Sequence, residues 1–171
     1  ASGVAWMRES ALSAGAVDDR LWLRVADTID KPILFRWQVD AYLAHIEALW
    51  GWDARWQERD FNKLFAALPP LVIMQRGADA VGYIQSQRRA QSLHLANIVL
   101  RAEMRGQGIG TRMLEHLQSR ASADGVAVTL KVFRSNKRAL AFYRALDFEE
   151  TGRSNTHFEL RWSPESSAKR L

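Results

Sequence analysis

Glycines alternate with other residues in the segment Arg105-Gly106-Gln107-Gly108-Ile109-Gly110, which lies where a helical apolar period begins. Backbone N–H groups at the start of a helix have no partner within the helix, and they form an anion site. Glycine leaves these groups open to a phosphate, and Arg105 can add a bidentate charged contact. We therefore predict that this loop and Thr111 bind a pyrophosphate. The alternative is a glycine-rich turn that binds no ligand.

Two other phosphate-binding motifs do not match this segment. A P-loop requires Lys and then Ser or Thr after its last glycine, but Thr111 follows Gly110 directly. A dinucleotide-binding fingerprint requires its third glycine where Thr111 stands, and it opens a long series of βα units that the remaining chain cannot hold. The segment is therefore not a P-loop, and it matches a dinucleotide-binding fingerprint poorly.

The elements that must position this loop follow from apolar periodicity and turn residues. In the first half we predict a strand at Leu21–Val25, a helix after Pro32 that stops at Gly51, and a helix from Asp53 to just before Pro69. We then predict strands at 71–75, 80–87 and 93–100, the first two joined by a hairpin turn.

Helix and strand patterns alternate in the second half of the chain. A helical period starts at Gly108, residues 126–132 alternate as a strand, a helix starts near Asn136, and residues 158–162 form a last strand. The order strand, helix, strand implies that 93–100 and 126–132 form a parallel pair with a right-handed connection. We expect one α/β domain at 21–162, an N-terminal extension at 1–20 that is disordered or foreign to the protein, and a C-terminal tail at 163–171.

Composition excludes several classes of function. The chain has no cysteine, which excludes disulfides and thiolate nucleophiles, and its four histidines show no metal-ligand spacing, so we expect no metal. No apolar stretch approaches the roughly 18 residues of a membrane span, so we expect a cytoplasmic protein without a membrane partner. The net charge of +5 favours anions, but no block of basic residues indicates a nucleic-acid partner.

The glycine segment resembles the Arg/Gln-x-x-Gly-x-Gly/Ala signature of the GNAT family of acyl-CoA-dependent N-acetyltransferases. A second motif of that family, Asn-x-x-Ala-x-x-Phe-Tyr-x-x-Leu-Gly-Phe, is matched at Asn136, Ala139, Phe142, Tyr143, Leu146 and Phe148. Ala102 replaces a common proline, and Asp147 replaces the usual glycine, although Asp tolerates the left-handed conformation. The resemblance covers residues 21–162. It implies a mixed, largely antiparallel sheet flanked by helices, with a splayed parallel strand pair that binds the cofactor.

The resemblance also implies acetyl-CoA as acetyl donor. Backbone groups of Ile98, Val99 and Leu100 would bind pantetheine like an added strand, and Asn136 would hydrogen-bond the same arm. The pyrophosphate would lie against Arg105, Gly106, Gln107, Gly108, Ile109, Gly110 and Thr111. Tyr143 would face the sulfur and donate a proton to the leaving thiolate, while an N–H near Val99 would stabilise the oxyanion. The alternative for Tyr143 is a core residue beside Phe142.

Sequence defines the acceptor side less well. Tryptophans cluster in the helical region that shapes the acceptor pocket in this family, and we predict Trp50, Trp52 and Asp53 as substrate-binding residues, with Asp53 or Glu47 attracting a cationic amine. Core packing is the alternative for each tryptophan. As general base, His94, Glu47, Asp53 and ordered water all stay open.

These features predict an N-acetyltransferase, a monomer or homodimer, that moves an acetyl group from acetyl-CoA to a primary amine by direct attack in a ternary complex. The acceptor is an amine of a small molecule or of a protein. The alternative is a noncatalytic acyl-CoA-binding or protein-interaction module of the same fold. A nucleic-acid binder is a weaker alternative.

Overall fold

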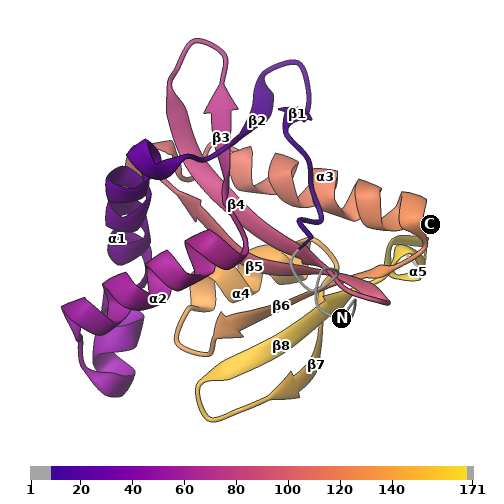
Figure 1. Cartoon of the computed structure of the whole chain (residues 1–171). Helices are drawn as coiled ribbons and strands as arrows, with labels where there is room; N and C mark the ends of the chain where they lie inside the picture. The colour runs from indigo at the N-terminus through magenta and orange to yellow at the C-terminus, as the bar shows by residue number, and fades with distance from the viewer. Residues whose placement is uncertain (1–8, 169–171) are drawn as a thin grey trace, which may run out of the picture.

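A mixed eight-stranded sheet runs through the molecule in the order β1-β2-β3-β4-β5-β6-β8-β7 (Figure 1). The computed structural model describes residues 9–168. The strands of the sheet are β1 (Gly15–Ala16), β2 (Leu21–Val25), β3 (Leu71–Gln75), β4 (Ala80–Arg88), β5 (Ser92–Leu100), β6 (Ala127–Phe133), β7 (Glu149–Arg153) and β8 (His157–Trp162). Neighbouring strands are antiparallel except β5 and β6, which are parallel. The predicted mixed, largely antiparallel sheet is confirmed.

Helices cover both faces of this sheet. They are α1 (Lys31–Trp50), α2 (Ala54–Ala67), α3 (Ile109–Asp124), α4 (Lys137–Ala145) and the short α5 (Pro164–Ala168), with 3-10 turns η2 (Thr28–Asp30) and η3 (Ala102–Met104). One core joins the sheet to α3 and α4, with Met113, Leu117 and Leu140 among its buried residues. A second core joins the sheet to α1 and α2 through Leu34 and Phe61. The sheet therefore buries side chains on both of its faces.

The parallel pair is joined over only part of its length. Residues 92–95 of β5 pair with residues 127–130 of β6, and beyond this point the two strands separate. The predicted splay is thus present. It lies at the carboxyl ends of both strands, on the side where α3 and α4 begin.

A bulge in β5 lies at the start of the splay. Gln85 of β4 pairs with Asn97 and Ser86 pairs with Leu95, which leaves Ala96 as an extra residue. The bulge reverses the alternation of β5: Leu95 lies in the core below α3, whereas Val99 lies in the core below α1 and α2. Because of this reversal, Asn97 and Val99 lie on the α1–α2 face of the sheet, and Ile98 and Leu100 on the other.

Residues 9–20 pack against the domain, where we expected no element. Ala11 and Leu12 are 3% and 5% exposed, and β1 pairs with β2. Asp18 forms an ion pair with Arg112 of α3 at 2.6 Å. A two-residue strand is too short to show alternation, so periodicity could not reveal it. The eight residues before this segment, which share the expected extension, lie outside the described residues.

Candidate active site

A cleft of about 1240 Å³ opens between the α1–α2 layer and the splayed ends of β5 and β6. Its walls come from α1, α2, β4, β5, the loop before α3, β6 and α4. Small-molecule sites usually measure about 300–1,000 Å³, so this cleft has room for two substrates.

The glycine loop forms one end of the cleft. Gly106 and Gly108 have φ angles of 75° and 84°, a left-handed conformation that side chains disfavour. Gly108 is the N-cap of α3, and no side chain caps this helix start. The first N–H groups of a sixteen-residue helix are therefore free of intrahelical partners at a wall of the cleft. This geometry suits an anion.

Gly106, Gly108, Gly110 and Thr111 line the cleft, whereas Gln107 and Ile109 do not. Ile109 is 2% exposed and packs in the core, because the helix period points it inward. The Gln107 side chain turns back and donates to the Glu103 carbonyl at 3.0 Å.

Two arginines flank this loop. Arg105 lines the cleft, but its guanidinium donates to Asp40 of α1 at 2.9 Å and to the Leu100 carbonyl at 3.2 Å. Arg138 of α4 also lines the cleft, and its Nη2 lies 3.9 Å from the point where a side chain at Gly106 would begin. Sequence analysis did not single out Arg138, since it lies about 30 residues beyond the loop.

The predicted pantetheine residues lie along the splay. Ile98, Val99 and Leu100 of β5 line the cleft, as does Asn136. Asn136 is the N-cap of α4, and its Oδ1 accepts from the Ala139 N–H at 3.1 Å. That contact uses the amide oxygen, so the Asn136 amide nitrogen keeps its N–H donors.

Tyr143 lines the cleft from α4, although only 8% of it is exposed. Its ring packs against Phe142 and Phe148 at centroid distances of 5.2 and 5.6 Å. Burial raises the pKa of the Tyr143 hydroxyl well above its usual value, and nearby Tyr42 raises it further. The hydroxyl therefore keeps its proton at neutral pH and is able to donate it.

A chain of polar side chains that sequence analysis missed crosses the floor of the cleft. Tyr42 of α1 donates to Asn97 Oδ1 at 3.3 Å, and Asn97 Nδ2 donates to Gln85 Oε1 at 3.0 Å. Gln85 Nε2 donates to the Leu68 carbonyl at 2.9 Å. Burial raises the pKa of Tyr42 to about 12, against an opposing effect of Arg105.

The α2 wall carries two carboxylates and exposed aromatic rings. Asp53, Trp56 and Asp60 line the cleft together with Trp50, the last residue of α1, whereas Trp52 does not. Asp53, Trp56 and Asp60 share one face of α2, because they lie three and four residues apart. Trp50 and Trp56 are 62% and 52% exposed, which is unusual for tryptophan. Trp56 and Asp60 thus join the two predicted residues in place of Trp52.

An aromatic cluster closes the far end of the cleft. Phe133 of β6 contacts His45 and His157 at centroid distances of 5.6 and 4.4 Å, and Tyr42 and Trp50 at 6.2 Å each. His45 Nδ1 also lies 2.8 Å from Ser135 Oγ. These contacts join α1 to the end of β6.

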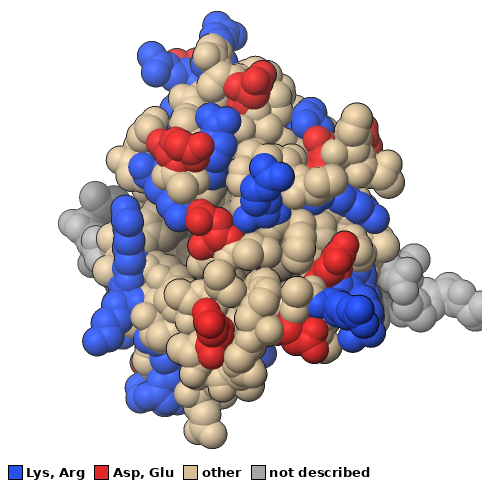
Figure 2. All heavy atoms as spheres, turned by 90° about the vertical axis from the view of Figure 1, so that its left-hand side faces the viewer, with Lys and Arg blue, Asp and Glu red and all other residues tan. Residues whose placement is uncertain are grey.

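The surface shows no large region of one charge over α1 and α2. Figure 2 shows basic and acidic side chains interspersed on this face. Within residues 9–168, no helix is long and apolar enough to cross a membrane, and no three His, Asp or Glu side chains gather as a metal site.

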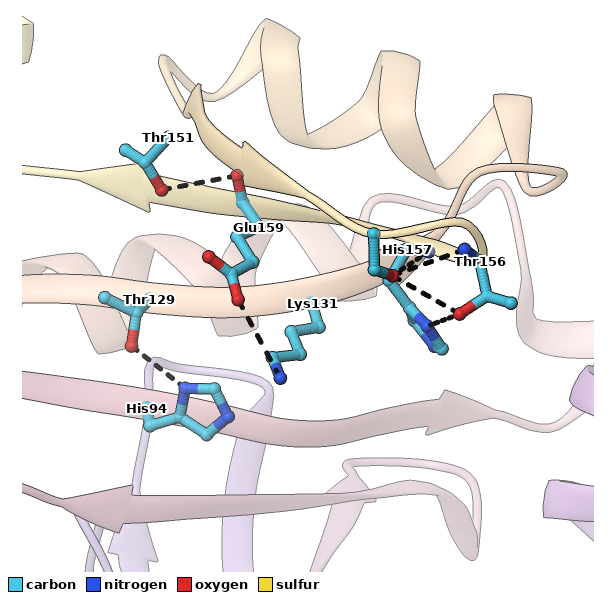
Figure 3. A network of polar contacts seen from close by, with 8 residues as sticks. His94, Thr129, Lys131, Thr151, Thr156, His157 and Glu159 are labelled. Carbon is cyan, nitrogen blue, oxygen red and sulfur yellow. Dashed lines mark hydrogen bonds and ion pairs between the residues drawn. The ribbon is translucent and has the colours of Figure 1, made fainter.

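Two of the three candidate bases do not line the cleft. His94 lies where β5 and β6 are still paired, with Nδ1 2.9 Å from Thr129 Oγ1 (Figure 3). Burial, followed by Arg89 and Lys131, lowers the pKa of His94 to about 4. Glu47 is also outside the lining, whereas Asp53 is within it but accepts the Trp56 N–H at 3.0 Å as the N-cap of α2.

Several solved acetyltransferases share the fold of this chain. The chain is similar to the PaiA N-acetyltransferase of Thermoplasma acidophilum, solved with coenzyme A, at 15% identity and a TM-score of 0.65 over 84% of this chain and 98% of that one. An acetyltransferase of Thermus thermophilus matches at 22% identity and a TM-score of 0.65 over 91% of this chain and 99% of that one. The spermidine N-acetyltransferase SpeG of Vibrio cholerae, solved as a point mutant, matches at 16% identity and a TM-score of 0.62 over 90% of this chain and 99% of that one.

A family model gives the assignment that likeness of fold alone does not. The model of the acetyltransferase (GNAT) family matches residues 32–148, from the start of α1 through α4 to Phe148. This span includes the glycine loop, both splayed strands and Tyr143, and it exceeds half of the chain. The chain therefore belongs to the GNAT acetyltransferase family.

Proposed function

We propose that this protein transfers an acetyl group from acetyl-CoA to a primary amine by direct attack in a ternary complex. Acetyl-CoA is the donor in the GNAT family. The observation that carries the proposal is a single cleft, which runs from the open start of α3 through the splay of β5 and β6 to the α2 wall.

The residues at the cofactor end fit a phosphorylated thioester. Open N–H groups at the start of α3 suit a pyrophosphate. The end of β5 still pairs with β4 but no longer with β6, so its edge on the β6 side offers backbone groups to an amide-containing arm. We assign Arg138 the cationic contact to the phosphates. Arg105 instead stabilises the loop through Asp40 and Leu100.

Acetyl-CoA supplies an activated acetyl group on sulfur. The amine forms the new nitrogen–carbon bond as the carbon–sulfur bond breaks, and the proton that nitrogen loses balances the one that sulfur gains. Tyr143 holds a proton in a buried position that faces the cleft, which supports its role as donor to the leaving sulfur.

The α2 wall supports a cationic acceptor. Asp53 and Asp60 are exposed carboxylates on the wall, and Trp50 and Trp56 are exposed aromatic rings, a side-chain type that attracts an ammonium group. SpeG, a structural neighbour, is named for spermidine. We propose that the acceptor is a primary amine of a small molecule or a protein, and that the molecule that carries this amine is cationic.

Ligand-linked stability tests the cofactor half of this proposal. Coenzyme A at one hundred times its dissociation constant should stabilise the fold by about 2.7 kcal/mol, and DNA should not. Gly108→Asp should abolish this thermal shift, because it places a carboxylate at the phosphate site. Gly77→Asp is a matched control: Gly77 has a φ of 80° in the β3–β4 turn, away from the cleft. Equal responses to coenzyme A in both variants would contradict the phosphate site.

Release of coenzyme A tests the transferase half. Wild-type protein with acetyl-CoA should release the free thiol faster when a primary amine is added, and amines that carry a further cationic group should react faster than amines that carry none. A panel of butylamine, a terminal diamine and a lysine-containing peptide separates these classes. Binding of coenzyme A without release on any amine would instead indicate the noncatalytic module.

A further inference from the structure

The chain of hydrogen bonds through Tyr42, Asn97 and Gln85 has a fixed direction. The Leu68 carbonyl can only accept, so the Gln85 side chain must place its nitrogen there. The Gln85 oxygen then faces Asn97 and must accept from its nitrogen, which turns the Asn97 oxygen toward Tyr42. The two ends of a side-chain amide are alike in shape, so the backbone carbonyl is what determines both orientations.

The direction of this chain determines what Tyr42 offers to the cleft. A tyrosine hydroxyl has one proton, and Tyr42 donates it to Asn97 Oδ1 at 3.3 Å. The oxygen of Tyr42 is therefore left with lone pairs for a molecule in the cleft. Tyr42, Asn97 and Gln85 all line the cleft, and Gln85 is only 3% exposed, so the chain is anchored in the protein interior.

Tyr42 and Tyr143 reach the cleft from opposite faces of the sheet. Tyr42 comes from α1 and contacts Phe133, whereas Tyr143 comes from α4 and packs with Phe148. The two rings are close enough for Tyr42 to affect the pKa of Tyr143. The point between them is where β5 leaves β6, because the Asn97 partner of Tyr42 lies just after the last paired residue, Leu95.

We propose that Tyr42 orients the attacking amine by accepting a hydrogen bond from one of its N–H groups, and that Asn97, Gln85 and the Leu68 carbonyl make Tyr42 an acceptor. This inference rests on the proposed acetyl transfer. An amine whose N–H is held by Tyr42 keeps its nitrogen lone pair free for the acetyl carbon, and Tyr143 serves the sulfur on the other side. Tyr42 is thus a positioning residue and not the base, because its hydroxyl stays neutral near pH 7 and its one proton is committed to Asn97.

The test compares two tyrosines that differ in their position relative to the cleft. Tyr42→Phe removes the oxygen but keeps the ring contact with Phe133. We expect kcat/KM for the amine to fall about tenfold to hundredfold, while the dissociation constant of acetyl-CoA stays unchanged. Tyr83→Phe is the control, because Tyr83 lies in the core and not in the cleft lining. Its hydroxyl donates at 2.6 Å to Gln38, which lines the cleft but is not part of the chain through Tyr42, Asn97 and Gln85. The control variant should reduce thermal stability and leave kcat/KM for the amine unchanged.

A double-mutant cycle tests the direction of the chain. Gln85→Met removes the anchor at Leu68, so Asn97 can rotate and Tyr42 can turn its O–H into the cleft. We expect Gln85→Met alone to lower kcat/KM for the amine, and the double variant with Tyr42→Phe to be no slower than Tyr42→Phe alone.

The outcomes separate this inference from the function on which it rests. Unchanged kinetics in Tyr42→Phe, equal losses in Tyr42→Phe and Tyr83→Phe, or additive losses in the double variant would each overturn the role of Tyr42 while acetyl transfer stands. A wild-type protein that releases no coenzyme A with butylamine, a diamine or a lysine-containing peptide would instead overturn acetyl transfer to amines, and this role with it.

Discussion

At the scale of single residues, two tyrosines to which we assign different tasks reach the cleft from opposite faces of the sheet. Tyr143 is surrounded by Phe142 and Phe148, so nothing charged opposes its neutral form. Burial raises its pKa, which makes the hydroxyl a weaker acid but ensures that the proton is present. Because thiols ionise near pH 8.5 and tyrosines near about 10, transfer to the thiolate is limited and stabilisation of its charge matters as well.

Loss of the Tyr143 hydroxyl should affect chemistry and not cofactor binding. Tyr143→Phe keeps the ring contacts with Phe142 and Phe148, and we expect turnover to fall by roughly 10² to 10⁴. The dissociation constant of acetyl-CoA should stay within about twofold, since one uncharged donor is lost. Single-turnover kinetics with saturating amine check this. Unchanged single-turnover rates would make Tyr143 a core residue.

Local motifs predicted most of the residues that line one end of the cleft, but not the residues that come together from distant segments. The glycine loop and Tyr143 lie in continuous patterns, so their positions were readable from spacing. Tyr42 and Asn97 are 55 residues apart, and their contact depends on the β5 bulge, which no periodicity reveals. Trp52 and Trp56 are equivalent in type, and only the rotation of α2 determines that Trp56 faces the cleft.

At the scale of elements, strong periodicity predicted most of the sheet. The strands at 21–25 and 71–75 have the predicted bounds. Strand β7 was missed because Glu149–Arg153 is polar and mostly exposed at the edge of the sheet, so it shows no alternation. Polar residues on such an edge also oppose pairing with other chains.

The turn after α4 confirms that Asp147 adopts the conformation for which glycine is usual. Its φ is 70°, the one positive value of a non-glycine residue in the described part of the chain. The Phe148 N–H then donates to the Tyr143 carbonyl at 3.2 Å and closes the helix. The turn therefore helps to hold the helix end that carries Tyr143.

Substitution of Asp147 should separate backbone strain from side-chain contacts. Asp147→Val should lower the free energy of unfolding by about 1–2 kcal/mol, because a β-branched residue disfavours a positive φ. Asp147→Gly relieves that strain and should therefore lose less stability than Asp147→Val. Urea denaturation at pH 7 measures both. Equal losses in the two variants would show that the Asp147 side chain, and not φ, stabilises this turn.

At the scale of the whole molecule, the cleft lies at the splay of β5 and β6. There the α1–α2 layer on one face of the sheet and the α3–α4 layer on the other both reach it. We assign the cofactor to the end of the cleft beside the α3–α4 layer and the acceptor to the end beside the α1–α2 layer. Phe133 connects them through rings on α1, and the Asp40–Arg105 ion pair connects α1 to the glycine loop. Exposed ion pairs contribute little, so the aromatic contacts are the main connection.

Proton binding by partly buried histidines should make the whole fold sensitive to mild acid. His94 has a pKa of about 4 in the folded protein and a usual value of 6.5, and the pKa values of His116 and His157 are lowered as well, with burial as the largest cause in all three. The unfolded chain therefore binds more protons between pH 6.5 and 4, and stability falls as pH falls through this range. The lowered pKa values of Asp18 and Asp30 act separately, below their usual value of 3.8.

Replacement of His94 should remove the largest part of this sensitivity. Between about pH 6.5 and 4, His94→Gln should lose about 1–2 kcal/mol less stability than wild type, an amount reduced because solvent screens a partly exposed group. Urea denaturation at several pH values measures the two slopes. His116→Gln serves as the comparison, since His116 also lies outside the cleft and its pKa is lowered less than that of His94. A His94→Gln slope as steep as that of wild type would show that burial of His94 does not control acid stability. A reduced slope would also argue against His94 as the base, because a group that is neutral in the fold down to about pH 4 is too weak to accept a proton from an ammonium ion efficiently.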